Sequence, residues 1–168
     1  MKVNSLRFYS FLPFFGTVVF LAYALYTEIY LFLNPCPLCM VQRYIYGLVG
    51  FLFLITLIKP PIALGRKLFA ILISLVSILG MAVSAWHVRL QHLPPEEVPD
   101  CGPGLDYMLD AFPLKDIIKE LINGSGDCAE VVWSFLGLSM PTWSFICFVG
   151  FFFYTIFWMN IKQRLVTI

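Results

Sequence analysis

Residues 35–58 read PCPLCMVQRYIYGLVGFLFLITLI, and this stretch decides the fold. The segment Val41–Ile58 is almost entirely apolar and close to the length of a membrane-spanning helix. Directly before it, Cys36 and Cys39 form a Cys-Xaa-Xaa-Cys pair, which can close to a disulfide and reopen with little backbone movement. Arg43 follows Cys39 by one helical turn, and a nearby cation favours the thiolate form of a cysteine. The stretch therefore predicts a redox-active dithiol at the end of a transmembrane helix.

Three further segments are as apolar as this one. Of the 168 residues, 60% are hydrophobic and 12% are charged, whereas soluble domains have about 45–50% apolar and about 25% charged residues. The predicted spans are Leu12–Leu33, Val41–Ile58, Leu68–Trp86 and Pro141–Ile161. The first span is too long for the core of a signal peptide and lacks a small-residue cleavage site, so we expect it to be retained. The spans predict an all-α membrane protein, in which one domain forms an up-down-up-down bundle of four transmembrane helices with outer loops at 34–40 and 87–140.

The charges are distributed unevenly between the two sides of the predicted membrane. On one side, the charged residues that flank the spans are all basic, and they are Lys2, Arg7, Lys59, Arg66, Lys67, Lys162 and Arg164. On the other side, the segment 87–140 carries nine acidic residues against three basic ones. Because loops rich in Lys and Arg stay in the cytoplasm, both termini and the loop at 59–67 are predicted to be cytoplasmic. Both cysteine-bearing loops then face the periplasm across a bacterial inner membrane, where disulfides persist.

The two outer connections differ in length and composition. In the short one, Pro35 and Pro37 are predicted to stop the first helix and to stiffen the turn. In the long one, apolar residues at 114, 117, 118, 121 and 122 recur with helical spacing, which predicts a short amphipathic helix. Such a helix either lies in the outer interface of the membrane or packs on the end of the bundle. The run Asn-Gly-Ser-Gly at 123–126 is predicted to end this helix and to leave a flexible hinge before Cys128.

A second pair of cysteines, Cys101 and Cys128, lies in the long outer loop. Two cysteine pairs beside a membrane indicate a path for electrons from thiols to an acceptor dissolved in the bilayer. The fifth cysteine, Cys147, falls within the fourth predicted span, where an unpaired cysteine usually acts as a small apolar side chain. We therefore expect Cys36, Cys39, Cys101 and Cys128 to carry the chemistry and Cys147 to take no part in it.

Two motifs connect the chain to a known family. The first is Pro35-Cys36-Pro37-Leu38-Cys39 followed by Gln42-Arg43, and the second is GSGDCAE at 124–130 with its continuation to Trp143. The first resembles the first outer loop of the DsbB family of quinone-dependent, disulfide-forming membrane proteins. The second is similar to the second-loop signature of that family and is the more specific of the two. The resemblance extends over essentially the whole chain, including the number of spans and the order of the cysteines, although some members carry an acidic residue where this chain has Gln42.

The resemblance implies an enzyme, a membrane thiol:quinone oxidoreductase that generates disulfides. A reduced periplasmic partner similar to DsbA would attack Cys101 of a Cys101–Cys128 disulfide, and the released Cys128 would attack Cys36. Cys39 would then be freed beside a quinone, either ubiquinone or menaquinone, which takes the electrons while the Cys36–Cys39 disulfide forms again. Each thiol step is an exchange that needs an attacking thiolate and a leaving thiol of low pKa. Membrane lipid surrounds the protein in this scheme, and no nucleic-acid partner is expected.

The resemblance also implies which residues line the quinone site. Arg43 lies on the same helical face as Cys39, and a charged residue inside a span is a functional candidate. His87 ends the third span, Gln91 follows one turn later, and both can hydrogen-bond to a quinone carbonyl. The alternatives are that Arg43 reaches outward to the lipid headgroups and that His87 is an ordinary interfacial residue. Glu28, near the outer end of the first span, is expected to be an interfacial or paired carboxylate without a catalytic role.

Three other interpretations stay open at the level of the sequence. A zinc site made of the four outer cysteines is disfavoured because Cys101 and Cys128 are far apart in the chain, and no metal is expected. A non-enzymatic membrane protein with two structural disulfides would leave Arg43 and the vicinal pair without a role. A vitamin K epoxide reductase-like quinone reductase carries its Cys-Xaa-Xaa-Cys late in the chain, whereas here the motif follows the first span.

Overall fold

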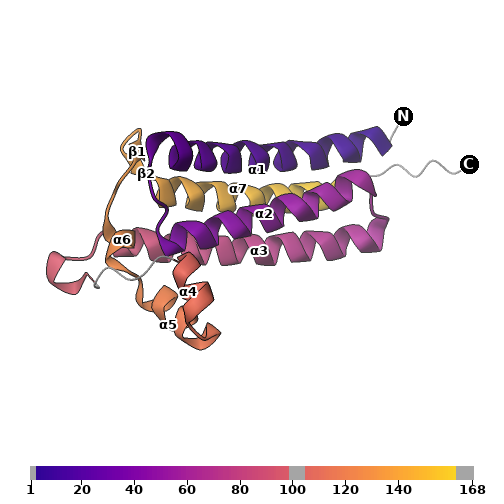
Figure 1. Cartoon of the computed structure of the whole chain (residues 1–168). Coiled ribbons are helices and arrows are strands. Elements are labelled where there is room, and N and C mark those ends of the chain that lie inside the picture. The colour runs from indigo at the N-terminus through magenta and orange to yellow at the C-terminus, as the bar shows by residue number, and fades with distance from the viewer. Residues whose placement is uncertain (1–2, 99–104, 162–168) are drawn as a thin grey trace, which may run out of the picture.

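Four long helices form the body of the protein. In the computed structural model, which describes residues 3–98 and 105–161, they are α1 (Val3–Leu31), α2 (Pro37–Ile58), α3 (Ala63–Leu90) and α7 (Met140–Asn160). Each is long and apolar enough to cross a membrane, so the predicted four-helix membrane fold is confirmed and the chain is a multi-pass membrane protein. The helices run side by side, and α1 begins at the same end of the bundle at which α7 ends (Figure 1). The shorter elements gather at the opposite end, beside the start of α2.

The first helix ends earlier than the sequence predicts. Phe32 adopts a left-handed backbone conformation, with a φ of 53°, and the N–H of Leu33 donates to the carbonyl of Thr27 over 3.2 Å. This closure is typical of a helix C-terminus, so α1 stops before the chain reaches Pro35. The helix thus ends before Pro35, and the prediction that the two prolines stop it stays a prediction. Pro37 instead lies in the first turn of α2, where no helical hydrogen bond needs its missing N–H.

The bundle packs as two helix pairs, α1 against α2 and α3 against α7, and the pairs are joined through α2 and α3. The half of the bundle in which α1 begins has a core of fully buried apolar side chains, which includes Val49, Phe53, Ile73 and Trp158. Farther along, α3 and α7 approach closely at Gly80, where an added Cβ would lie 2.6 Å from the ring of Phe148. Only a residue without a side chain fits at this contact without displacing the ring.

Among the described residues, six short elements lie between α3 and α7. They are the 3-10 turn η1 (Pro95–Glu97), the helices α4 (Leu105–Ala111), α5 (Leu114–Asn123) and α6 (Gly126–Ala129), and the strands β1 (Ser134–Phe135) and β2 (Leu138–Ser139). The two strands pair antiparallel, with Ser134 opposite Ser139 and Phe135 opposite Leu138. The hairpin lies beside the end of α1 and the start of α7, whereas α4 and α5 project from the other side of the bundle (Figure 1).

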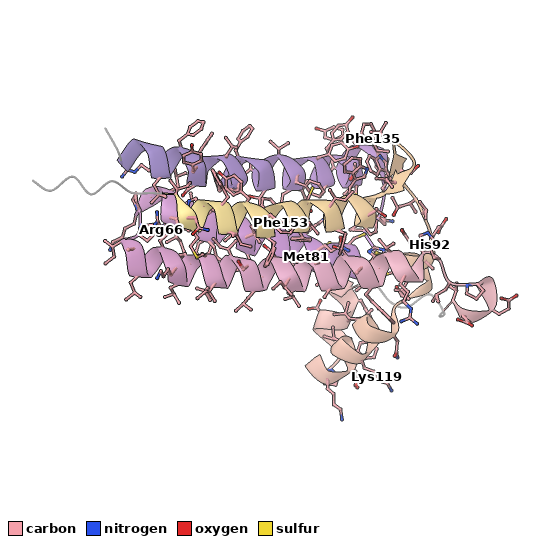
Figure 2. All side chains as sticks on the ribbon, turned by 180° about the vertical axis from the view of Figure 1, so that it is seen from behind. Arg66, Met81, His92, Lys119, Phe135 and Phe153 are labelled. Carbon is pink, nitrogen blue, oxygen red and sulfur yellow. The ribbon has the colours of Figure 1, made fainter. Side chains whose placement is uncertain are left out.

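The amphipathic helix predicted at 114–122 is present as α5. Ile117 on its apolar face is buried and clusters with Met108 of α4, and Met40 and Val41 in the first turns of α2 pack against this cluster. Lys119 on its polar face is exposed and points away from the bundle (Figure 2). The apolar face of α5 therefore packs on the end of the bundle, which is the second of the two arrangements that the sequence predicts.

The segment between α5 and α6 is packed, not open. Gly124 follows the last residue of α5 with a φ of 79°, a left-handed conformation that glycine adopts freely at a helix end. Gly124 is buried against the side chain of Leu90, and the next residue, Ser125, is also buried. The predicted end of the helix is confirmed. The predicted flexible hinge is wrong, because this segment packs against α3 and holds Cys128 in the same cluster as Leu90.

Candidate active site

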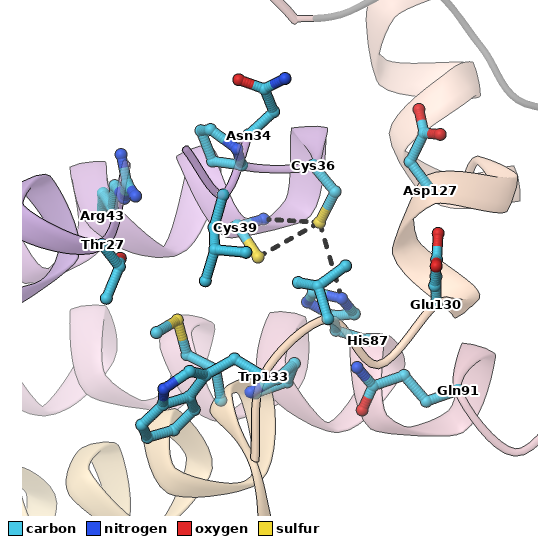
Figure 3. A pocket seen from close by; sticks show the side chains of 15 residues that line it. Thr27, Asn34, Cys36, Cys39, Arg43, His87, Gln91, Asp127, Glu130 and Trp133 are labelled. Atoms are coloured by element: carbon cyan, nitrogen blue, oxygen red, sulfur yellow. Dashed lines mark hydrogen bonds between the residues drawn. The ribbon is translucent and has the colours of Figure 1, made fainter. Parts of the chain in front are cut away.

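The vicinal cysteines lie where α2 begins. Cys36 has an extended backbone and is the N-cap residue of the helix, and its Sγ accepts a hydrogen bond from the N–H of Cys39 over 3.4 Å. The two sulfur atoms are 3.2 Å apart, with the Cys36 thiol donating to Cys39 (Figure 3). The N–H groups and the dipole at a helix N-terminus favour negative charge on a nearby sulfur. The local fold therefore places the two sulfurs close enough to form a disulfide, beside the N-terminus of a helix.

The structure brings Cys128 of the long loop next to this pair. Cys128 is fully buried in α6, and its Sγ, the Cys36 Sγ and a ring nitrogen of His87 lie within 4.8 Å of one another. The hydroxyl of Ser125 lies 3.5 Å from the Cys128 Sγ. The predicted partner of Cys128, Cys101, lies outside the described residues. A cysteine from the long loop is thus close enough to a cysteine of the short loop for exchange after a small movement.

Neighbouring thiols and burial shift the pKa values of Cys36 and Cys128, the two described cysteines that lie outside the membrane-spanning helices. The hydrogen bond with Cys128 lowers the pKa of Cys36. The hydrogen bond from Cys36 to Cys39 and the burial of Cys36 raise this pKa by more, so the net shift is upward. The adjacent Cys36 thiol raises the pKa of Cys128, and burial adds to that rise. In the fully reduced site, Cys36 and Cys128 are therefore protonated at neutral pH. With His87, these thiols form a donor set that can bind zinc, although the sequence predicts a site that works without a metal.

His87, in the last turn of α3, is buried and has a partner on each ring nitrogen. Its Nε2 lies 3.6 Å from the Cys36 Sγ, and its Nδ1 lies 3.0 Å from the Nε2 of Gln42 on α2. Gln42 is itself buried, with 4% of its surface exposed. The predicted role of His87 in quinone binding stays a prediction, and its observed contacts direct the ring toward Cys36. The sequence assigns no role to Gln42, because its contact with His87 depends on how α2 and α3 are rotated against each other.

Arg43 and Glu28 form an ion pair between α2 and α1. Arg43 also donates to the carbonyl of Ala24 over 3.0 Å. Within the four predicted spans, Glu28 and Arg43 are the only charged residues in the sequence, so each has the opposite charge as its partner. The paired carboxylate predicted for Glu28 is confirmed. The ion pair holds the guanidinium group of Arg43 at the wall of the neighbouring pocket.

This pocket encloses about 560 Å³ of space between protein atoms, part of it open to solvent. Polar side chains on its wall include Cys39, Arg43, His87 and Gln91 (Figure 3). The Oε1 of Gln91 accepts a hydrogen bond from the hydroxyl of Ser139 over 2.6 Å, which fixes the orientation of its amide group. The apolar part of the wall includes Leu33, Val132, Trp133, Met140 and Pro141. The pocket therefore combines cysteine sulfur with hydrogen-bond donors and a mostly apolar lining.

The pocket unites residues from separate spans. Of the predicted site residues, those that line it are Cys36, Cys39, Arg43, His87 and Gln91. Cys128 is buried beside Cys36, and Cys101 cannot be placed because it lies outside the described residues. Trp133 also lines the pocket, and the sequence carries a signal for it, since Trp133 belongs to the motif at 124–143.

Comparison with known proteins shows the family of this chain. A family model described as "Disulfide bond formation protein DsbB" matches residues 6–158 of the chain. The chain belongs to the DsbB family. A DsbB-family relative named "Disulfide bond formation protein B", from Saccharophagus degradans, is 47% identical over 162 residues, which cover 96% of this chain and 97% of the relative. The protein of the same name from Methylococcus capsulatus is 45% identical over 164 residues, which cover 97% of this chain and 100% of the relative.

Membership of the DsbB family confirms the resemblance seen in the sequence. A third relative with the same name, from Chromohalobacter salexigens, is 51% identical over 117 residues, which cover 69% of this chain and 68% of the relative. The family name gives disulfide bond formation as the activity, and the four apolar helices make the chain a membrane protein. Because a disulfide forms when two thiols lose two electrons, the chain is a disulfide-forming oxidoreductase of the membrane. Three cysteines at one end of a four-helix bundle suit that activity, because exchange among thiols needs sulfur atoms in contact.

Proposed function

We propose that the protein reoxidises a periplasmic dithiol partner and passes the electrons to a quinone in the membrane. The partner is a thioredoxin-fold thiol oxidase similar to DsbA, and the quinone is ubiquinone or menaquinone. The observation that supports this most directly is the position of Cys128, whose sulfur lies within 4.8 Å of the Cys36 sulfur. This proximity links the loop that would meet the partner to the cysteine pair that would meet the quinone.

The cysteines would pass the electrons by thiol–disulfide exchange. A thiolate of the partner attacks Cys101, the Cys101–Cys128 bond breaks, and Cys128 leaves as a thiolate. Cys128 then attacks Cys36, which forms a Cys36–Cys128 bond and releases Cys39 as a thiolate. The second thiol of the partner displaces Cys101 from the mixed disulfide, and the freed Cys101 attacks Cys128 and releases Cys36. The partner is then oxidised, the Cys101–Cys128 bond is restored, and Cys36 and Cys39 hold the two electrons.

The chemistry of the pocket beside Cys39 suits a quinone. Its apolar side chains, Trp133 among them, fit a planar ring, and Arg43 and Gln91 carry N–H groups that can donate to carbonyl oxygens. A quinone bound there would accept two electrons and two protons, and the Cys36–Cys39 disulfide would form again. Arg43 stays protonated even at the edge of the bilayer, so it would favour negative charge on Cys39 and on the oxygen that it binds.

The proposal includes a location and an orientation. The protein would lie in the bacterial inner membrane with both termini in the cytoplasm and both cysteine loops in the periplasm. The seven basic residues that flank the spans on one side, and the acidic segment 87–140 on the other, support this orientation. The end of the bundle that carries Cys36 and Cys128 would then face the oxidising compartment, in which a DsbA-like partner is found.

A reconstituted assay tests the proposal. Purified protein is mixed with a reduced DsbA-like partner and a quinone, and the quinone absorbance is followed with time. Replacing Cys36, Cys39, Cys101 or Cys128 singly with serine should abolish partner-dependent quinone reduction, because each change removes one sulfur of the path. Cys147→Ser is the matched control and should keep close to the full rate, because Cys147 packs in a different part of the core. Full turnover by any of the four variants, or an inactive Cys147→Ser protein, would contradict the proposal.

A further inference from the structure

Gln42 takes no part in the steps above, although it is a buried polar side chain beside the site. It lies on α2, three residues after Cys39, and 4% of its surface is exposed. Its Nε2 is 3.0 Å from the Nδ1 of His87 on α3. A buried amide group is costly unless it is hydrogen-bonded, so this contact accounts for its presence in the core.

The hydrogen bonds of this group have a defined direction. An amide N–H of Gln42 can only donate, so the Nδ1 of His87 is the acceptor and carries no proton. In a neutral imidazole the proton is then on Nε2, which lies 3.6 Å from the Cys36 Sγ and can donate to it. The Cys36 thiol in turn donates to the Cys39 Sγ over 3.2 Å. Every hydrogen in the series from Gln42 through His87 and Cys36 therefore points toward Cys39.

We propose that Gln42 is a positioning residue that sets the tautomer of His87 and thereby directs this hydrogen-bond chain toward the Cys39 sulfur. The inference rests on the proposed function, because it assigns the chain to stabilising the Cys39 thiolate before its electrons leave. Hydrogen bonds in series polarise one another, and a thiolate is a suitable end point because it accepts without donating. Gln42 is not among the residues that line the pocket in the described parts of the chain, so it acts through His87.

An acidic residue at position 42 would reverse the chain. An ionised carboxylate accepts hydrogen bonds and donates none, so His87 would carry its proton on Nδ1. The Nε2 would then present its lone pair to Cys36, and the Cys36 thiol would donate to His87 instead of Cys39. Cys39 would lose a hydrogen-bond donor. Glutamine and glutamate at position 42, although they have the same shape, are therefore expected to favour opposite arrangements of protons at the two sulfurs.

Nitrogen-15 NMR of the imidazole ring tests the tautomer. The chain has two histidines, so His92→Gln leaves His87 as the only reporter, and the protein is purified through a tag without histidine. In the reduced protein with Gln42, the proton is expected on Nε2. In the Gln42→Glu variant, it is expected on Nδ1. Thr56→Val is the matched control, because it removes another fully buried hydrogen-bonding side chain of α2 and should leave the signals of His87 unchanged.

Alkylation of the reduced protein measures the consequence at the sulfur. Iodoacetamide is added at a fixed pH, and modification of Cys39 is followed by mass spectrometry of its peptide. Gln42→Glu should slow this modification about fivefold, as expected for the loss of one ordinary hydrogen bond. Gln42→Met keeps the length of the side chain without an N–H, so it releases the tautomer of His87 without reversing it and should slow the modification by a smaller factor. Thr56→Val should react at the rate of the unchanged protein.

Either of two results would overturn the inference. One is a proton on Nδ1 in the protein with Gln42, or a tautomer that is the same in the Gln42→Glu variant. The other is an unchanged rate of Cys39 alkylation in both variants at position 42. If Gln42→Glu does not fold, the inference is still tested by the spectrum of the unchanged protein and by the rate of Cys39 alkylation in Gln42→Met. These readouts need no quinone and no partner, so failure of the proposed function would appear separately, in the quinone assay of the unchanged chain.

Discussion

Arg43 is the residue whose charge is best placed to act on the pocket, and Glu28 fixes its position. We expect Arg43→Gln to raise the KM for quinone about tenfold, because a charge-assisted hydrogen bond to a carbonyl oxygen is lost. Exchange between the partner and Cys101 should keep its rate, because that chemistry takes place in the other loop. Quinone titration in the steady state measures the first effect, and trapping of the mixed disulfide at Cys101 measures the second.

Two variants at the same ion pair serve as controls for this prediction. Arg43→Lys should be milder than Arg43→Gln, because the charge remains and only the planar group is lost. Glu28→Gln should lower thermal stability, because it leaves the guanidinium group without its counterion. A variant with glutamine at both positions should be less destabilised than the sum of the single changes. If Arg43→Gln instead blocks the partner step and leaves the quinone dependence unchanged, Arg43 does not serve the quinone.

Single residues also show where the sequence is informative and where it is not. That Cys39 and Arg43 share a face could be predicted, because they are four residues apart on one helix. The contacts between helices could not. The pairing of Gln42 with His87 depends on the rotation of α2 against α3, and side-chain packing, not hydropathy, sets that rotation.

At the scale of elements, two glycines with the same backbone conformation offer a matched comparison. Gly124 and Gly137 have φ values of 79° and 77°, so alanine is strained by about 1 kcal/mol at either position. A Cβ at Gly124 would also collide with the side chain of Leu90, whereas Gly137 has open space around it. We expect Gly124→Ala to lower the free energy of unfolding by about 1–2 kcal/mol more than Gly137→Ala does.

The same comparison reports on the packing of Cys128. Gly124→Ala should speed alkylation of Cys128 in the reduced protein, because the segment that buries this cysteine would be displaced from α3. Gly137→Ala should leave that rate unchanged. Thermal unfolding in detergent and mass spectrometry of the alkylated peptide measure the two effects. Equal rates of Cys128 alkylation in the two variants would show that contact with Leu90 does not hold Cys128 in place.

The elements differ in how far the sequence specifies them. The long helices could be predicted from hydropathy, because a membrane demands about 20 apolar residues in a row. The helix α5 could be predicted from the spacing of its apolar residues. The four-residue helix α6 and the hairpin of β1 and β2 could not, because such short elements are held by contacts with the bundle and carry no periodicity of their own. The end of α1 at Phe32 also lacked a signal, since glycine or asparagine is usual at such a position.

At the scale of the whole molecule, the orientation in the membrane is the property that the proposed function needs most. We expect reporter fusions after Gly65 and at the C-terminus to read as cytoplasmic, and a fusion near Pro99 to read as periplasmic. The physical reason is the set of basic residues beside the spans on one side, with no acidic residue among them. A periplasmic signal at Gly65 would place the cysteines in a reducing compartment, and the proposed electron path would then be untenable.

The ion pair of Glu28 with Arg43 also bears on how the protein is made. A charged side chain on a helix that enters the bilayer alone adds up to about 2.5–3.5 kcal/mol to the cost of insertion. Because α1 and α2 are joined only by residues 32–36, the two charges can meet while both helices are still at the translocon. During biosynthesis, α1 and α2 should therefore enter the lipid together as one helical hairpin. Insertion of this hairpin would then also form the part of the pocket wall that carries Arg43.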